Sequence, residues 1–241
     1  MALGVATLAF FSGMLGFGVA LAAVPFLSLF LDDLVHQVQP MSIALGGATA
    51  LFAALGFGRS GYVEWRLGAL LAIVAGLVSP LGVWLAQRTN PTVLWTLYFI
   101  SVSYLLYRMV HPHFTQQAVR SIAPLKALPL AVPIAIYSTM LGVGVGFLLA
   151  PTLIALGMEP KRAAGTNALA VVAQSLTAFL YHAPTAQIDG GMLAITALGG
   201  VVGSYFGARF TSKRLGGAQV RWVFALMMGA MMLYRAIMLF R

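Results

Sequence analysis

Two glycine-rich stretches hold the residues of this chain that could best bind a ligand. Residues 12–25 read SGMLGFGVALAAVP and residues 138–151 read STMLGVGVGFLLAP, so Ser, Met, Leu, Gly, Gly, Val and Pro recur 126 positions apart. Glycine leaves backbone N–H groups uncovered, and uncovered N–H groups at a helix N-terminus attract anions. The alternative is that these glycines only permit close helix packing. The first interpretation predicts an anion site at Gly16, Gly18, Gly142, Gly144 and Gly146.

A second helix start follows each stretch, PMSIAL at 40–45 and GTNALA at 165–170. Ser, Thr and Asn side chains cap helices and also donate hydrogen bonds to oxyanions, so ligand binding and simple capping both stay open. The two starts align Ser42 with Thr166, and the polar candidates are Ser42, Thr166 and Asn167. Deeper in these helices lie side chains that could line a path or bond a neighbouring helix, namely Thr49, Gln174, Ser175 and Thr177.

The composition excludes a soluble globular protein. The chain has 241 residues, of which 61% are hydrophobic and 8% charged, and its mean hydropathy is +0.94. A transmembrane β-barrel would show alternating ten-residue segments, which are absent from the sequence. Apolar stretches close to the ~20 residues that a membrane-spanning helix needs recur instead. They cover 41–57, 67–87, 92–109, 163–181, 190–209 and 220–240. We therefore expect an all-α, multi-pass integral membrane protein.

The charge of the chain reflects its topology. Fourteen Lys and Arg against five acids give a net charge of +9, but the basic residues lie between apolar stretches. We therefore expect the lipid bilayer and a small anion as partners, and no nucleic acid. The absence of Cys excludes thiolate and iron–sulfur chemistry. The four His are too scattered for a metal site, so we expect no cofactor, no metal and histidines in loops.

The duplication extends along the chain. Val63-Glu64 matches Ile188-Asp189, and Gly82 matches Gly207, both at an offset of 125. Gly207 also ends a GSYFG motif, whose small residues suit close helix contact. The sequence therefore predicts one membrane domain, 1–241, built from two like halves. The first repeat covers about 1–110, a linker about 111–124, and the second repeat about 125–241.

Two topologies fit the glycine-rich stretches. Each stretch has only about half a membrane's length of apolar residues on either side. In one topology each stretch is a re-entrant hairpin or broken segment followed by about three crossings, so the second half is inverted. In the other, all eight segments cross and the repeats are parallel.

The positive-inside rule favours inverted repeats. Eight crossings would divide the basic residues evenly between the two faces. Inverted repeats would place only Arg88, Arg235 and Arg241 on one face and the other eleven of the 14 opposite.

Inverted repeats with interrupted helices are typical of secondary transporters, whose broken segments meet near the bilayer midplane and bind substrate there. The five acids, Asp32, Asp33, Glu64, Glu159 and Asp189, all fall in expected loops, so no intramembrane carboxylate is available as a proton relay. We therefore expect anion efflux by alternating access, driven by the membrane potential, an ion gradient, or both. An anion channel and an intramembrane lipid-phosphate enzyme are the alternatives, although the enzyme would need intramembrane catalytic groups.

The chain resembles the TauE/SafE family of sulfite and organosulfonate exporters over essentially its whole length. The likeness is carried by Gly16, Gly18 and Pro25 in the first copy. In the second copy it is carried by Gly142, Gly144, Gly146 and Pro151, followed by Gly165, Thr166 and Asn167. The resemblance implies a non-enzymatic permease of the plasma (inner) membrane that exports sulfite, sulfoacetate or a related sulfonate. The first copy departs from the pattern at Ala20 and at Pro40-Met41-Ser42, so the two copies need not contribute equally. The sequence leaves a homodimer open.

Overall fold

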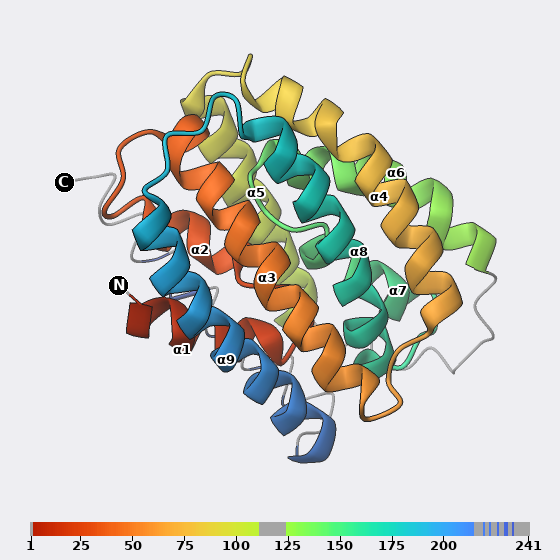
Figure 1. Ribbon diagram of the computed structural model, residues 1–241. Helices are drawn as coiled ribbons and strands as arrows, with labels where there is room; N and C mark the ends of the chain where they lie inside the picture. The colour runs from red at the N-terminus through yellow and green to blue at the C-terminus, as the bar shows by residue number, and fades with distance from the viewer. Residues whose placement is uncertain are drawn as a thin grey trace.

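The computed structural model describes residues 2–110 and 124–214, with six single positions between 219 and 233. All the regular secondary structure in these residues is helical (Figure 1). A short π-helical turn, Leu34–Val38, precedes α3. The helices are α1 (Ala2–Gly13), α2 (Ala20–Leu27), α3 (Gln39–Gly58), α4 (Trp65–Ala86), α5 (Pro91–Val110), α6 (Pro124–Met140), α7 (Gly146–Ala155), α8 (Pro160–His182) and α9 (Gly190–Arg214).

Four helical segments in the described part of the chain are long and apolar enough to cross a bilayer, which confirms the membrane class. They are Leu34–Gly58, Trp65–Ala86, Pro160–His182 and Gly190–Arg214, of 22 to 25 residues each. At ~1.5 Å per residue each exceeds ~30 Å of hydrocarbon. Another expected span, 92–109, matches α5. The sixth, 220–240, and the linker, 111–124, lie almost entirely outside the described residues.

The helices break at both glycine-rich stretches, as the repeat predicts. Six residues, 14–19, separate α1 from α2, and five, 141–145, separate α6 from α7. We call these segments loop 1 and loop 2. Gly16 and Gly18 in loop 1 and Gly142 in loop 2 have φ of 67°, 65° and 73°, a conformation that side chains with a Cβ disfavour. After loop 1 the chain folds back towards α1, as the packing of the Phe26 ring of α2 on Gly4 of α1 shows.

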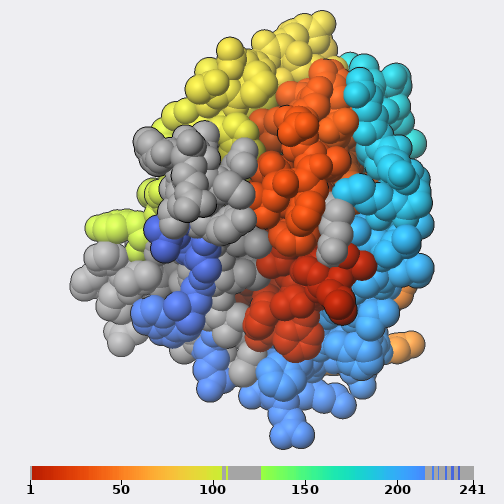
Figure 2. All heavy atoms as spheres, turned by 90° about the vertical axis from the view of Figure 1, so that its left-hand side faces the viewer, coloured from red at the N-terminus to blue at the C-terminus, as the bar shows by residue number. Residues whose placement is uncertain are grey.

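The two halves interlock. Helix α1 packs on α9, and its repeat equivalent α6 packs on α4. The first helix of each half therefore packs against a helix of the other half. Figure 2 shows α1 (red) against α9 (blue). A Cβ at Gly207 would lie 2.0 Å from the Phe10 carbonyl oxygen, and one at the equivalent Gly82 would lie 2.4 Å from that of Ile136. Both matched glycines therefore permit backbone contact, which the sequence predicts for Gly207.

The central helices α3 and α8 pack together and run in opposite directions. Near the start of α3, the His36 carbonyl accepts a 2.8 Å hydrogen bond from the N–H of Gln187, which follows α8. After the end of α3, the Glu64 N–H donates to Thr166 Oγ1 near the start of α8, at 3.0 Å. We call these two ends of the bundle the His36 end and the Glu64 end.

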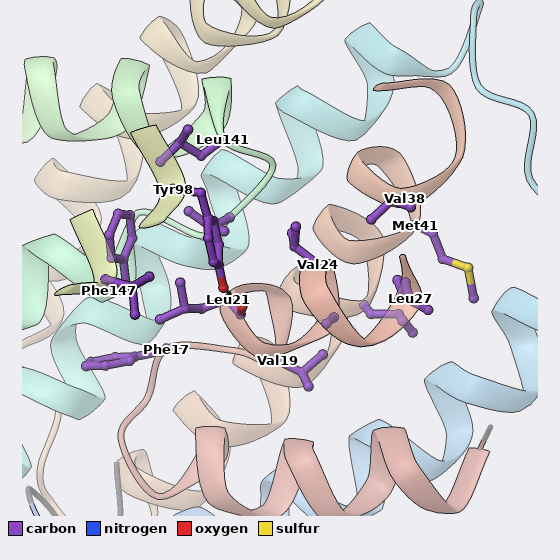
Figure 3. Packing of buried hydrophobic residues seen from close by; sticks show 14 of the residues in the cluster. Phe17, Val19, Leu21, Val24, Leu27, Val38, Met41, Tyr98, Leu141 and Phe147 are labelled. Carbon is purple, nitrogen blue, oxygen red and sulfur yellow. Dashed lines mark hydrogen bonds between the residues drawn. The ribbon is translucent and has the colours of Figure 1, made fainter. Parts of the chain in front are cut away.

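The largest hydrophobic cluster among the described residues buries loop 1 and α2 against both halves (Figure 3). Leu21 and Val24 of α2 pack in it with Phe147 of α7. Tyr98 of α5 is buried beside them and donates a 2.7 Å hydrogen bond to the Leu21 carbonyl. The loops therefore sit on a core that the two halves build jointly.

Candidate functional site

In each half, a long helix accepts a hydrogen bond from the start of the short helix that follows the glycine loop of the same half. The Val19 N–H, at the start of α2, donates to Thr49 Oγ1 of α3 at 2.9 Å. The Val145 N–H, at the start of α7, donates to Gln174 Oε1 of α8. Thr49 and Gln174 are 125 positions apart, so equivalent residues perform the same task. Gln174 Nε2 also donates to Thr139 Oγ1 at 2.5 Å.

Each long helix also holds the glycine loop of the opposite half. Ser42 Oγ of α3 donates a 2.7 Å hydrogen bond to the Gly142 carbonyl of loop 2. Asn167 Nδ2 of α8 donates a 3.1 Å hydrogen bond to the Gly16 carbonyl of loop 1. Donors and acceptors are again 125 and 126 positions apart. The four residues thus make a reciprocal pair of contacts across the two halves.

The two loops touch at Phe17. A Cβ placed on Gly144 would lie 3.2 Å from the Phe17 carbonyl oxygen, and one on Gly146 would lie 3.0 Å from Phe17 Cα. Side chains at these positions would push the loops apart. Gly144 in loop 2 and Gly146 at the start of α7 therefore permit the close packing that the sequence left as an alternative, and they bring the two loops together.

The N–H groups of Gly16 and Gly142 donate to the carbonyls of Gly13 and Thr139, but the other three glycine N–H groups expected to bind an anion are free in the described part of the chain. Those of Gly18, Gly144 and Gly146 donate no hydrogen bond to any described residue, whereas the N–H groups on either side of Gly144 do. The Asn167 Oδ1 atom is likewise buried without a partner among the described residues. Buried N–H groups are normally paired, so unpaired ones at a helix start mark a place where a polar ligand fits.

Eight of the nine predicted site residues therefore lie at the two loops or contact them: Gly16, Gly18, Ser42, Gly142, Gly144, Gly146, Asn167 and Gln174. The ninth, Thr166, lies at the Glu64 end, where it accepts the Glu64 N–H. All nine are buried in this conformation.

Sequence reasoning missed Gln39 at this site. Its side chain packs against Gly142, and Gln39 Nε2 donates a 3.1 Å hydrogen bond to the Met140 carbonyl. Gln39 Oε1 is buried with no partner among the described residues. The sequence feature that could have identified Gln39 is its position, since it is a polar residue directly before the PMSIAL helix start at 40–45.

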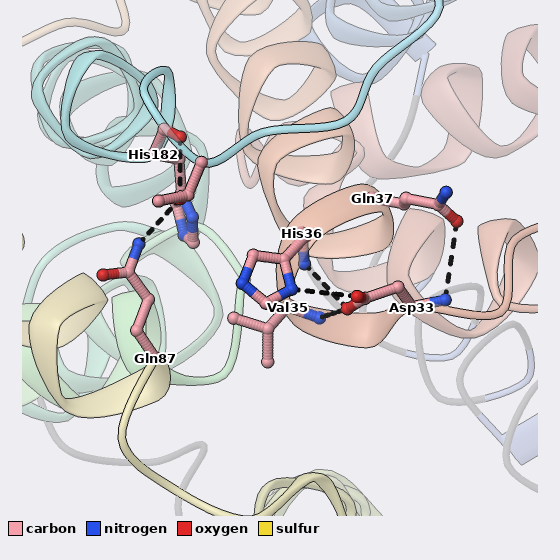
Figure 4. A network of polar contacts seen from close by, with 7 residues as sticks. Asp33, Val35, His36, Gln37, Gln87 and His182 are labelled. Carbon is pink, nitrogen blue, oxygen red and sulfur yellow. Dashed lines mark hydrogen bonds and ion pairs between the residues drawn. The ribbon is translucent and has the colours of Figure 1, made fainter.

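A polar cluster closes the His36 end (Figure 4). The Asp33 carboxylate accepts the N–H groups of Val35 and His36, each at 2.9 Å, and lies 2.9 Å from His36 Nδ1. Partial burial raises the pKa of Asp33, but these hydrogen bonds together outweigh it and hold the pKa below its ordinary value. His182, expected in a loop, is the last residue of α8 and is fully buried.

The electrostatics of the loops favour an anion. All five acidic residues lie outside the bodies of the described helices, as expected, at or before helix starts. The loop region instead presents helix N-termini, amides and hydroxyls. In the described part of the chain no group of three or more acidic or His side chains could hold a metal ion.

A family model described as sulfite exporter TauE/SafE matches residues 1–235. The chain belongs to this family. No curated protein and no solved structure matched the chain. Membership of the TauE/SafE family, together with the apolar helices, makes the chain a multi-pass membrane protein of a sulfite-transporter family. The description of the TauE/SafE family fits a transporter and not an enzyme.

Proposed function

We propose that the chain exports a small sulfur-containing anion, such as sulfite or a sulfonate, across the plasma membrane. The anion would bind where loops 1 and 2 meet. The observation that carries the proposal is the contact of two broken helices at Phe17, beside unpaired N–H groups of Gly18, Gly144 and Gly146. The partial positive charge of two helix N-termini would stabilise the anion there.

We further propose that the two halves are inverted in the membrane and that each glycine stretch is re-entrant. The contact of Glu64 with Arg162 supports this arrangement, because eight crossings would put these residues on opposite faces of a ~30 Å membrane. Lys161 Nζ also donates a 3.2 Å hydrogen bond to the Ser212 carbonyl, so the last turn of α9, which carries Lys213 and Arg214, lies at the Glu64 end as well. The positive-inside rule then makes the Glu64 end cytoplasmic.

Transport would proceed by alternating access. Ser42 and Asn167 tie each long helix to the opposite loop, so rocking one half against the other would change both loops together. The buried site is closed in this conformation and must open to one face at a time. A membrane potential negative inside supplies ~2.3 kcal/mol per charge per 100 mV for anion efflux. An ion gradient is the alternative or additional driving force.

Single cysteines test the proposed topology cleanly, because the natural chain has none. Ser60→Cys and Lys161→Cys should react with an impermeant maleimide only from the cytoplasmic side, and Ala183→Cys only from the opposite side. Eight crossings would instead put positions 60 and 161 on opposite faces. Labelling of intact cells and of inverted vesicles measures the difference.

Gly144→Ala tests the site itself. The added methyl group would approach Val171 Cγ1 to 3.0 Å and the Phe17 carbonyl oxygen to 3.2 Å, beside the free N–H groups. We expect sulfite flux into liposomes, under an imposed potential, to fall about tenfold or more, because the crowded methyl group displaces the loop and its N–H groups no longer bond the anion. The matched control is Gly76→Ala, whose nearest contact would be 3.6 Å, and it should transport normally.

The same liposome assay separates carrier from channel. A carrier gives saturable sulfite flux, whereas flux that rises linearly with sulfite concentration would indicate a channel. Equal flux through the Gly144→Ala and wild-type proteins would refute binding at the loops.

A further inference from the structure

Two shallow apolar grooves lie side by side on the face formed by α1, α3 and α9. The first, of about 340 Å³, runs between α3 and α9 and is lined by Leu55, Val202 and Phe206, with Arg59 and Tyr205. The second, of about 280 Å³, is lined by Phe10, Phe206 and Phe210. Phe206 borders both grooves and is 59% exposed, so the walls face the hydrocarbon of the membrane.

Basic side chains gather where these grooves reach the Glu64 end. Arg59 lies at the first groove, and Arg209, Lys213 and Arg214 lie at the second. The five Asp and Glu side chains of the chain all lie in its described part, and none of them pairs with these four cations. Four cations at the edge of the bilayer therefore have no side-chain carboxylate to neutralise them.

The Arg59 side chain is held across the first groove. Arg59 Nη1 donates a 2.7 Å hydrogen bond to Tyr205 Oη, which ties the end of α3 to α9. A guanidinium has five N–H donors in a planar fork, so donors remain that match the geometry of a phosphate. The groove thus combines an apolar wall with a guanidinium that is positioned to donate hydrogen bonds to a phosphate.

We propose that this face binds an anionic phospholipid of the leaflet at the Glu64 end. Its acyl chains would lie along the two grooves, and its phosphate would lie between Arg59 and the cluster of Arg209, Lys213 and Arg214. Basic pockets beside transmembrane helices on the cytoplasmic side are typical sites for anionic head groups. The inference depends on the membrane location of the chain and is independent of the anion that it transports.

A second copy of the chain suits this face poorly. A two-fold contact places the same patch of each subunit opposite itself. Here it would bring the four cations of one copy against the four of the other, a like-charge arrangement that opposes association. A phospholipid supplies the missing negative charge as well as the apolar chains.

Lipid binding to the purified full-length protein tests the proposal. Native mass spectrometry would compare phosphatidylglycerol with phosphatidylcholine, and we expect the wild-type protein to retain phosphatidylglycerol preferentially. Arg59→Gln and Arg209→Gln should each weaken phosphatidylglycerol binding about fivefold, and the double variant about 25-fold. The matched control is Arg88→Gln at the opposite end of the bundle, where Arg88 lies over the Trp84 ring, and it should bind like wild type.

A groove variant provides an independent check. Val202→Trp would fill the first groove without changing its charge, and it should reduce phosphatidylglycerol binding while sulfite flux persists. Equal binding of the two lipids by the wild-type protein would overturn the proposal, as would equal losses in the Arg88→Gln and Arg59→Gln variants. Efficient disulfide cross-linking of Phe206→Cys between two chains in membranes would also overturn it, because the face would then be a subunit interface.

Discussion

Replacing Gly16 by alanine should destabilise the protein more than replacement of a glycine outside the broken helices. The Cβ would lie 2.0 Å from the Ala164 carbonyl oxygen of α8, and the residue has φ of 67°. The left-handed conformation and the collision with backbone together should lower the free energy of unfolding by about 3 kcal/mol or more. Thermal unfolding of the detergent-solubilised protein measures the loss.

Gly61→Ala is the control for Gly16→Ala. Gly61 has a similar φ of 74°, but a Cβ there would meet nothing within 4 Å. Alanine at this position should therefore lower the free energy of unfolding only because of the left-handed backbone conformation, by about 1 kcal/mol. If the two variants lost the same stability, the close approach of loop 1 to α8 would not be what requires glycine.

The second large effect is expected from Gln174→Leu. The change removes the acceptor of the Val145 N–H and the donor to Thr139, both of them buried. A buried N–H left unpaired costs about 1–3 kcal/mol, and the start of α7 would lose the contact that positions loop 2. We expect reduced stability and loss of sulfite flux in the liposome assay.

Ser175→Ala is the matched control on the same helix. Ser175 is also buried, but its hydroxyl has no hydrogen-bond partner among the described residues. Its removal should leave stability and sulfite flux nearly unchanged.

Thr49 and Gln174 occupy equivalent positions in the two halves. Thr49→Val should therefore reproduce the Gln174→Leu phenotype in milder form, because Thr49 accepts the hydrogen bond from the start of α2. Normal flux in Gln174→Leu would show that the loop needs no such anchor.

The broken helices were predictable because their cause is local. Two glycine-rich stretches in matching contexts reveal where a helix cannot continue, and the structure breaks both helices there. The unpaired backbone N–H groups follow from the same glycine pattern, and the positions of all five acids follow from the spacing of the apolar stretches. The close helix contact at Gly207 was predictable as well, since small residues four positions apart lie on one face of a helix.

The residues that contact the glycine loops were harder to predict, because a shift of one residue along a helix changes the direction in which the side chain points. The sequence aligned Ser42 with Thr166, yet the residue that reaches the opposite loop as Ser42 does is Asn167. Adjacent helical positions point ~100° apart, so Thr166 contacts Glu64 instead. The burial of His182 and the role of Gln39 depend on contacts between the two halves, which no local pattern contains.

The position of a bound anion tests the central claim most directly. Selenite is a heavier analogue of sulfite, and its selenium can be located in crystals of the wild-type protein by anomalous scattering. We predict a single strong peak where loops 1 and 2 meet, placed so that the selenite oxygens can accept hydrogen bonds from the N–H groups of Gly144 and Gly146. A peak at the protein surface only, or at one loop remote from the other, would contradict a shared site at the two glycine loops.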